Sequence, residues 1–194
     1  MEIGATKAVQ DRLKTTKIEE SKGASLVFCW DTHLTKIKGR NVLFIVNASN
    51  CYTIAMTDIE PRNWNYYTMY IRSVIHGVMQ EMGYSEDQIG QYFKMSGDTI
   101  VTKTHGRKSV GGINRMVMDA QYFGKKLEKE AKYQWELSEY LNRDICQPEG
   151  FDAYGYPSEL FKLDMERLGI AAKRKPAKVI DFSQYIESNR GTND

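Results

Sequence analysis

The sequence predicts an α+β protein, in which an antiparallel β-meander is covered on one face by two long helices and a small helical appendage follows at the C-terminal end. Runs of strand-forming residues joined by tight turns fill residues 25–56. Two long stretches with apolar residues at three- and four-residue spacing follow, over residues 61–83 and 113–141. Alternation indicates strands and a period near 3.6 indicates helices, so strands and helices occupy separate parts of the chain.

Size and charge limit the possible classes of protein. The chain has 194 residues, of which 41% are hydrophobic and 11% aromatic, which is enough for a folded core. Its net charge of +2, from 27 basic and 25 acidic residues, excludes a protein whose whole surface binds polyanions. A composition break at Pro148 and Gly150 predicts an α+β domain over residues 1–147. Residues 148–194 are predicted to form the helical appendage and a basic tail.

The cysteines and the first residues predict a reduced, cytoplasmic protein. Cys29, Cys51 and Cys146 are odd in number and widely separated, and they form no paired motif. The charged opening segment lacks the apolar stretch of a signal peptide. No apolar run approaches the roughly 20 residues that span a bilayer, so we expect no membrane contact.

The first third of the chain is predicted to contain the strands. Residues 1–3 form a short strand, and Thr6 caps a short helix that runs to Leu13. Residues 26–30 and 33–38 follow as strand, a turn at Gly39 leads into residues 42–46, and a second turn leads into residues 51–56.

The helices are marked by their start and stop signals. Pro61 starts the first long helix and Gly83 ends it, while Ser85 caps a second helix that closes near Gly97. A strand over residues 99–102 comes next, and the second long helix begins after Gly112. The appendage contributes one further helix, which starts at Pro157 and ends at Gly169.

The segment over residues 100–116, IVTKTHGRKSVGGINRM, carries the most chemistry. We interpret it as a strand, a basic loop over residues 103–112, and a helix start released by Gly111 and Gly112. Cations and backbone N–H groups at a helix start bind anions. The alternative is a solvated loop, and the spacing does not match a P-loop. The predicted anion- or nucleic-acid-binding residues are Lys103, Thr104, His105, Arg107, Lys108, Ser109 and Arg115.

A second candidate lies in the sequence CWDTH. Cys29, Asp31 and His33 alternate, so they share one face of a strand and suggest either a nucleophile with a base or part of a metal site. No second ligand pair accompanies them. We therefore interpret Cys29 as a core residue and place Asp31 and His33 at the strand end. We predict no catalytic residue, no metal ligand and no cofactor.

The C-terminal tail carries a secondary basic patch, formed by Lys173, Arg174, Lys175 and Lys178. An apolar segment over residues 179–186 follows it and docks either on its own domain or on a protein partner.

Four blocks of the sequence resemble a known family: ATKAVQDRL, FCWDTHLTKIKGRNVLFIVN, YTIAM and TKTHGRKSVGGINRM. They resemble a family of uncharacterised bacterial proteins, found largely in Firmicutes and catalogued as a domain of unknown function. The resemblance covers about residues 1–125. It implies a bacterial, cytosolic origin, with a mobile element as a source. The family has no assigned activity, cofactor or catalytic residue, so the resemblance assigns no role to any residue.

These observations favour a non-catalytic binding or regulatory module that engages an anionic ligand such as nucleic acid, or another phosphate-bearing ligand, through residues 103–112. One alternative is a small enzyme that uses His105 or His33 as acid or base, with Arg107 holding an anionic substrate. Another alternative is a protein–protein adaptor that acts through the long helix and the C-terminal tail.

Overall fold

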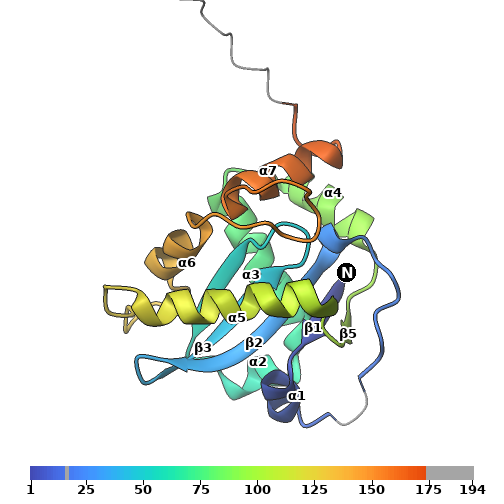
Figure 1. Ribbon diagram of the computed structural model, residues 1–194. Coiled ribbons are helices and arrows are strands. Elements are labelled where there is room, and N and C mark those ends of the chain that lie inside the picture. Colours follow the sequence, from blue (N-terminus) through green and yellow to red (C-terminus); the bar gives the residue numbers. More distant parts are fainter. Residues whose placement is uncertain (16–17, 174–194) are drawn as a thin grey trace, which may run out of the picture.

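The computed structural model describes residues 1–15 and 18–173, which form a five-stranded mixed sheet with helices on both faces (Figure 1). The strands are β1 (Glu2–Ala5), β2 (Cys29–Ile37), β3 (Arg40–Asn47), β4 (Thr53–Thr57) and β5 (Ile100–Thr102). The helices are α1 (Lys7–Leu13), α2 (Pro61–Asn65), α3 (Tyr67–Glu81), α4 (Glu86–Ser96), α5 (Gly106–Tyr122), α6 (Trp135–Asn142) and α7 (Pro157–Arg167), and a 3₁₀ turn, Leu26–Phe28, precedes β2. The predicted α+β class is confirmed.

The sheet order is β4-β3-β2-β1-β5. The meander predicted over residues 25–56 is present, because β2, β3 and β4 pair antiparallel. The short strand predicted at the start of the chain is also present as β1. It lies between β2 and β5 and runs parallel to both. The carboxyl ends of these three strands therefore meet at one edge of the sheet.

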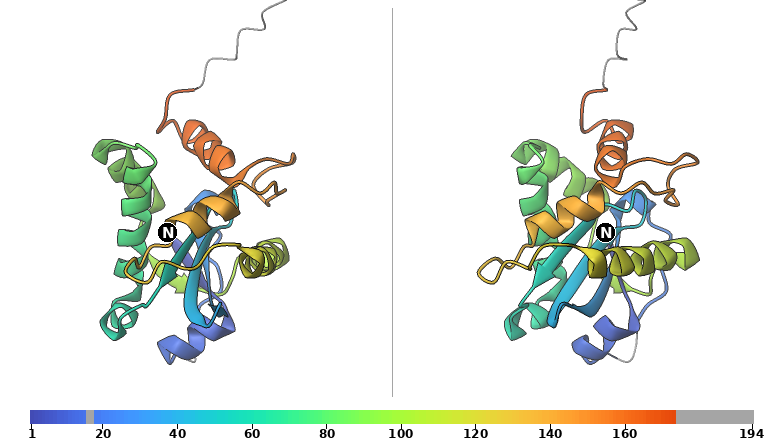
Figure 2. Two further views of the ribbon diagram at one scale, coloured as in Figure 1. Left: turned by 90° about the vertical axis from the view of Figure 1, so that its left-hand side faces the viewer. Right: turned by 60° about the vertical axis from the view of Figure 1, so that its left-hand side comes forward.

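Helices cover both faces of the sheet (Figure 2). An apolar core lies on each side of the sheet. Ile3 and Trp30 face α3 and α4, whereas Phe44 and Ala55 face α5 and α6. The alternation of β-branched and aromatic side chains produces this division, because successive residues of a strand point to opposite faces. Our placement of both long helices on one face was therefore wrong: both faces of the central strands are apolar, and each face is covered by its own helix layer.

Two predicted helices are interrupted. The stretch over residues 61–83 is split at Tyr66, which has φ −115° and ψ 41°, into α2 and α3. The stretch over residues 113–141 contains the end of α5, a loop and α6. The loop is polar because its backbone and side chains cover the edge of the sheet: Thr57 N–H donates to Lys132 O over 2.7 Å, and Gln134 N–H to Ala55 O over 2.9 Å.

The C-terminal elements pack against the same body. Phe161 of α7 lies against Trp30 and Tyr52, with ring centroids 6.1 and 5.2 Å away, and Met165 is also fully buried. The division predicted at residues 147 and 148 stays a prediction. In the part of the chain described here, no helix is both long and apolar enough to cross a bilayer.

Candidate functional site

A cluster of buried polar side chains lies between the sheet and the start of α5. Glu2 of β1 pairs with Cys29 of β2, and two residues further along Gly4 pairs with Asp31. Trp30 points into the opposite core, so Cys29 and Asp31 face α5 together, as their alternation predicts. Parallel pairing of neighbouring strands thus brings two carboxylates and a thiol to one place.

His105 connects the two carboxylates. Its Nδ1 lies 2.7 Å from Asp31 Oδ1, and its Nε2 lies 2.9 Å from Glu2 Oε2. The side chains of His105 and Glu2 each expose 3% of their surface, and that of Asp31 exposes none. An imidazole whose two nitrogens both face carboxylate oxygens donates to both only when it is protonated. The cluster is therefore built around an imidazolium ion.

The pKa values of this cluster agree with that charge state. Burial acts to lower the pKa of His105, but hydrogen bonds to Asp31 and Cys29 and the charge of Asp31 outweigh it and raise the pKa to about 10. Burial acts to raise the pKa of Glu2. Hydrogen bonds from Ser21, His105 and the backbone of Lys22 outweigh that effect and leave the pKa below its usual value.

Asp31 also fixes the beginning of α5. Its carboxylate accepts the His105 backbone N–H over 3.1 Å and a hydrogen bond from the Ser109 hydroxyl. The positive end of a helix stabilises a negative charge placed there. Gly106, with φ 92°, lets the chain turn directly into the helix. The helix thus begins seven residues earlier than predicted.

Gly4 makes room for this carboxylate. A Cβ atom at Gly4 would lie 1.7 Å from Asp31 Oδ1 and 3.0 Å from Thr104 Cα. Only glycine therefore fits at this position while Asp31 keeps its contacts. Gly111 and Gly112 have a different role from the predicted one, because both lie inside α5 and do not release the chain into it.

Two of the predicted anion-binding residues point into the protein. His105 and Ser109 are buried and bound to Asp31, so they do not face a ligand on the surface. The prediction of a basic loop over residues 103–112 is also wrong, since residues 106–112 are the first two turns of α5.

Two further predicted residues are neutralised by carboxylates. Lys103 pairs with Glu20. Arg115 pairs with Asp144 and lies 3.6 Å from Asp119. These pairs reduce the positive charge that either side chain offers to an anion.

Arg107 and Lys108 remain available on the surface. Both are exposed on the first turn of α5, and neither takes part in an ion pair with any residue that the structure describes. Thr104 beside them is half-buried. The carboxylate of Glu149 lies close to the residue before these cations. Its Oε2 would be 4.0 Å from a Cβ atom added at Gly106.

The remaining sequence candidates are placed as follows. His33 lies in the middle of β2 and not at the strand end as predicted; it is half-buried with Nδ1 3.1 Å from Thr6 Oγ1, and burial lowers its pKa. Lys173 is exposed at the end of the described chain. Arg174, Lys175 and Lys178 lie outside the described residues, as does the apolar segment over residues 179–186.

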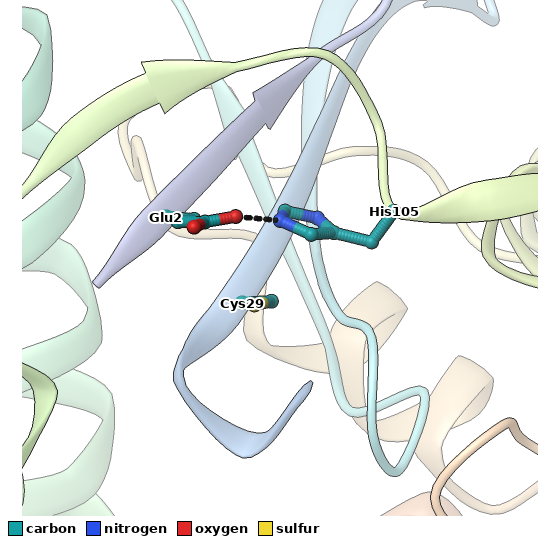
Figure 3. Close-up of side chains that lie close together, drawn as sticks. All are labelled: Glu2, Cys29 and His105. Atoms are coloured by element: carbon teal, nitrogen blue, oxygen red, sulfur yellow. Dashed lines mark hydrogen bonds and ion pairs between the residues drawn. The ribbon is translucent and has the colours of Figure 1, made fainter. Parts of the chain in front are cut away.

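One group of side chains in this cluster has the composition of a metal site. Glu2, Cys29 and His105 each offer a ligand atom, and these atoms lie within 4.8 Å of one another (Figure 3). Sequence reasoning missed Glu2 because it belongs to no motif that suggests metal binding or catalysis. Gly4 is the signal that could have revealed the cluster. A glycine inside a strand often marks a place where another group approaches the backbone closely.

One hollow of the surface lies on the other side of the sheet. A groove beside Trp64 of α2 is bordered by Leu13, Tyr67 and Val101 and has a volume of about 290 Å³. Arg12 lies over the Trp64 ring, 5.6 Å from its centroid. This groove belongs to the α3 side of the sheet, so it is separate from Arg107 and Lys108.

Comparison with protein families gives one finding. The sequence model of the family Domain of unknown function (DUF6933) matches residues 2–160, which include β1, the meander and α5. The chain therefore belongs to this family, and the resemblance seen in its four sequence blocks is confirmed over a longer stretch. Neither the curated proteins nor the solved structures that were compared gave a significant match.

Proposed function

We propose that this member of the DUF6933 family is a non-catalytic binding module that engages nucleic acid through the outward face of α5. The observation that carries the proposal is the pair Arg107 and Lys108, which is exposed at the positive end of the helix without an ion-pair partner among the described residues. Cations in this position stabilise phosphate groups by charge-assisted hydrogen bonds.

The outward face of α5 supports this proposal along its length. Gly111, Asn114 and Met118 follow the two cations at helical spacing and are exposed. The first carboxylate in the helix is Asp119. A small residue and an amide next to the cations let a phosphate backbone approach the helix closely and accept or donate further hydrogen bonds.

Buried contacts hold this face in position. Asp31 binds both the backbone and the side chain of His105, immediately before the two cations. The cations therefore project from a fixed helix start, which reduces the ordering cost of binding. His105 and Ser109 are then buried residues that hold the start of α5 in place and do not touch the ligand.

The test is salt-dependent binding of a fluorescein-labelled DNA duplex and of an RNA of the same sequence. Each phosphate contact contributes about −0.9 to the slope of log K against log salt on a duplex, so Lys108→Ala and Arg107→Ala should each reduce the slope by about one. Lys94→Ala is the matched control, because Lys94 is an exposed cation on α4, across the sheet. An unchanged slope in both α5 variants would refute the proposal.

The enzyme alternative used His105 or His33 as acid or base, and for His105 it has less support. The His105 side chain is enclosed by two carboxylates, and the raised pKa keeps its imidazole protonated at neutral pH, which is unsuitable for a general base.

The adaptor alternative retains one specific observation. Met118 and Tyr122 of α5 expose 62% and 79% of their surface. Under this alternative, Tyr122→Ser would abolish binding to a protein partner and leave the salt slope on nucleic acid unchanged.

We also propose, from the resemblance, that the protein is bacterial and cytoplasmic and derives from a mobile element. The tail cations Lys173, Arg174, Lys175 and Lys178 would supply a second, sequence-independent contact to the same polyanion.

A further inference from the structure

We propose that Glu2, Cys29 and His105 bind a divalent transition-metal ion, with zinc as the best match. This inference is independent of the proposed nucleic-acid binding, since it concerns the buried side of α5. It rests on the arrangement of the three side chains and on the groups that hold them.

The three ligand atoms come from three elements that the fold holds together. Glu2 and Cys29 are register partners on β1 and β2, and His105 reaches them from the segment before α5. In Figure 3, Glu2 and His105 point toward each other and Cys29 lies beside them. All three ligand atoms lie within 4.8 Å of one another, and all three residues are buried. One ion can therefore reach all of them.

The donor set matches zinc. A thiolate, an imidazole nitrogen and a carboxylate oxygen are the ligands that zinc uses in proteins, and three protein ligands leave one tetrahedral position for water or another group. With bonds of about 2.1 Å, the oxygen and nitrogen of a tetrahedral site lie about 3.4 Å apart. Glu2 Oε2 and His105 Nε2 are now 2.9 Å apart, so they need to separate by only about 0.5 Å.

The surrounding groups orient the ligands as in known metal sites. His105 Nδ1 lies 2.7 Å from Asp31 Oδ1, which directs the Nε2 lone pair toward the ion in the neutral imidazole. The other Glu2 oxygen, Oε1, accepts the Lys22 backbone N–H over 2.8 Å. These contacts leave Glu2 Oε2 and His105 Nε2 as the atoms that face each other and the thiol.

The charges balance when an ion replaces protons. Without metal, the Cys29 thiol donates weakly to the carbonyls of Ala24 and Ser25, and His105 is an imidazolium. Binding of one divalent ion releases the thiol proton and the Nε2 proton. The cluster with Asp31 then carries the same net charge, −1, before and after binding. The buried site therefore accepts the ion without adding charge to the protein interior.

The segment that precedes β2 gives a path to the site. Backbone groups of Lys22, Ala24 and Ser25 contact Glu2 and Cys29, and residues 19–23 are exposed. Glu19 is bridged to Thr102 of β5, so a shift of residues 20–25 alone would open the cluster to solvent while the strands stay paired.

The experiment adds Co²⁺ or Zn²⁺ to the full-length protein after chelator treatment under reducing conditions. We expect one Co²⁺ per chain, with the thiolate-to-cobalt absorption of a tetrahedral site, and a rise of the melting temperature with Zn²⁺. Cys29→Ser should abolish the thiolate absorption and weaken Zn²⁺ binding at least about tenfold. Asp31→Asn should weaken it about 10–100-fold while the absorption persists.

A matched control uses the other two buried cysteines. Cys51→Ser/Cys146→Ser removes thiols that lie outside the cluster, and it should leave stoichiometry and absorption unchanged. The proposal is overturned if wild-type protein gives no thiolate absorption with Co²⁺ and no rise in melting temperature with Zn²⁺. It is also overturned if the absorption survives Cys29→Ser or disappears in the Cys51→Ser/Cys146→Ser variant. If the Cys29→Ser variant does not fold, the proposal is judged by the Co²⁺ absorption and Zn²⁺-dependent melting temperature of the wild type and by the absorption of the Cys51→Ser/Cys146→Ser variant.

Discussion

Gly4→Ala should destabilise the protein far more than a single methyl group normally does. The added Cβ would lie 1.7 Å from Asp31 Oδ1 and 3.0 Å from Thr104 Cα, so the carboxylate must leave its place. Overpacking alone costs about 1–3 kcal/mol. Breaking a buried ion pair costs about 3–5 kcal/mol, and here the imidazolium of His105 loses one of its two carboxylate partners. We expect a loss of about 3–5 kcal/mol in the free energy of unfolding, since moving Asp31 relieves the clash.

Urea unfolding followed by tryptophan fluorescence and circular dichroism measures this loss. Gly77→Ala is the matched control: Gly77 lies inside α3 with no atom within 4 Å of an added Cβ, so we expect no loss, and a gain of up to about 1 kcal/mol. In the Gly4→Ala background, Asp31→Ala should cost much less than it does in the wild type, because the two residues are coupled. A Gly4→Ala variant within about 0.5 kcal/mol of wild type would refute the reasoning.

Three further predictions follow from the same contacts. The pKa of His105 is raised to about 10 in the folded protein, so its stabilising effect is complete below pH of about 6.5. Stability should then fall as pH rises toward 10, by at most about 1.4 kcal/mol per pH unit, and urea unfolding of His105→Gln should show a flatter profile. Gly150→Ala should lower stability by about 1–3 kcal/mol in the same assay, because its Cβ would lie 2.1 Å from Ser49 Oγ; an unchanged midpoint would contradict this. Glu149→Gln should strengthen binding of the labelled duplex, because a carboxylate beside the start of α5 repels phosphate; weaker binding would count against the proposed surface.

Local patterns in the sequence were sufficient to predict the meander and most helix starts. Ser85 and Gln88 form the expected capping box, and Pro61 and Pro157 start helices as predicted. Such capping and turn signals depend on residues that are neighbours in the chain, so they can be recognised from a single sequence. The break between α2 and α3 at Tyr66 has no such signal. The helical spacing of apolar residues continues across it, so the sequence predicts one helix.

The candidate site could be predicted only in part. The alternation of Cys29 and Asp31 correctly placed both on one face of β2. The position of β1 between β2 and β5 depends on contacts about 30 and 100 residues apart in the chain, which local periodicity does not encode. Without that position, neither Glu2 nor the burial of His105 could be inferred, and the histidine was taken for a surface residue.

Nitrogen NMR of the His105 ring tests most directly whether the buried cluster holds the start of α5. In metal-free protein at pH 7.5 (about one pH unit above the usual histidine pKa), we expect both ring nitrogens to be protonated. We also expect both ring N–H protons to exchange slowly with water, because they are bound to Asp31 and Glu2. A neutral imidazole that titrates near its usual pKa, with rapidly exchanging protons, would contradict the account.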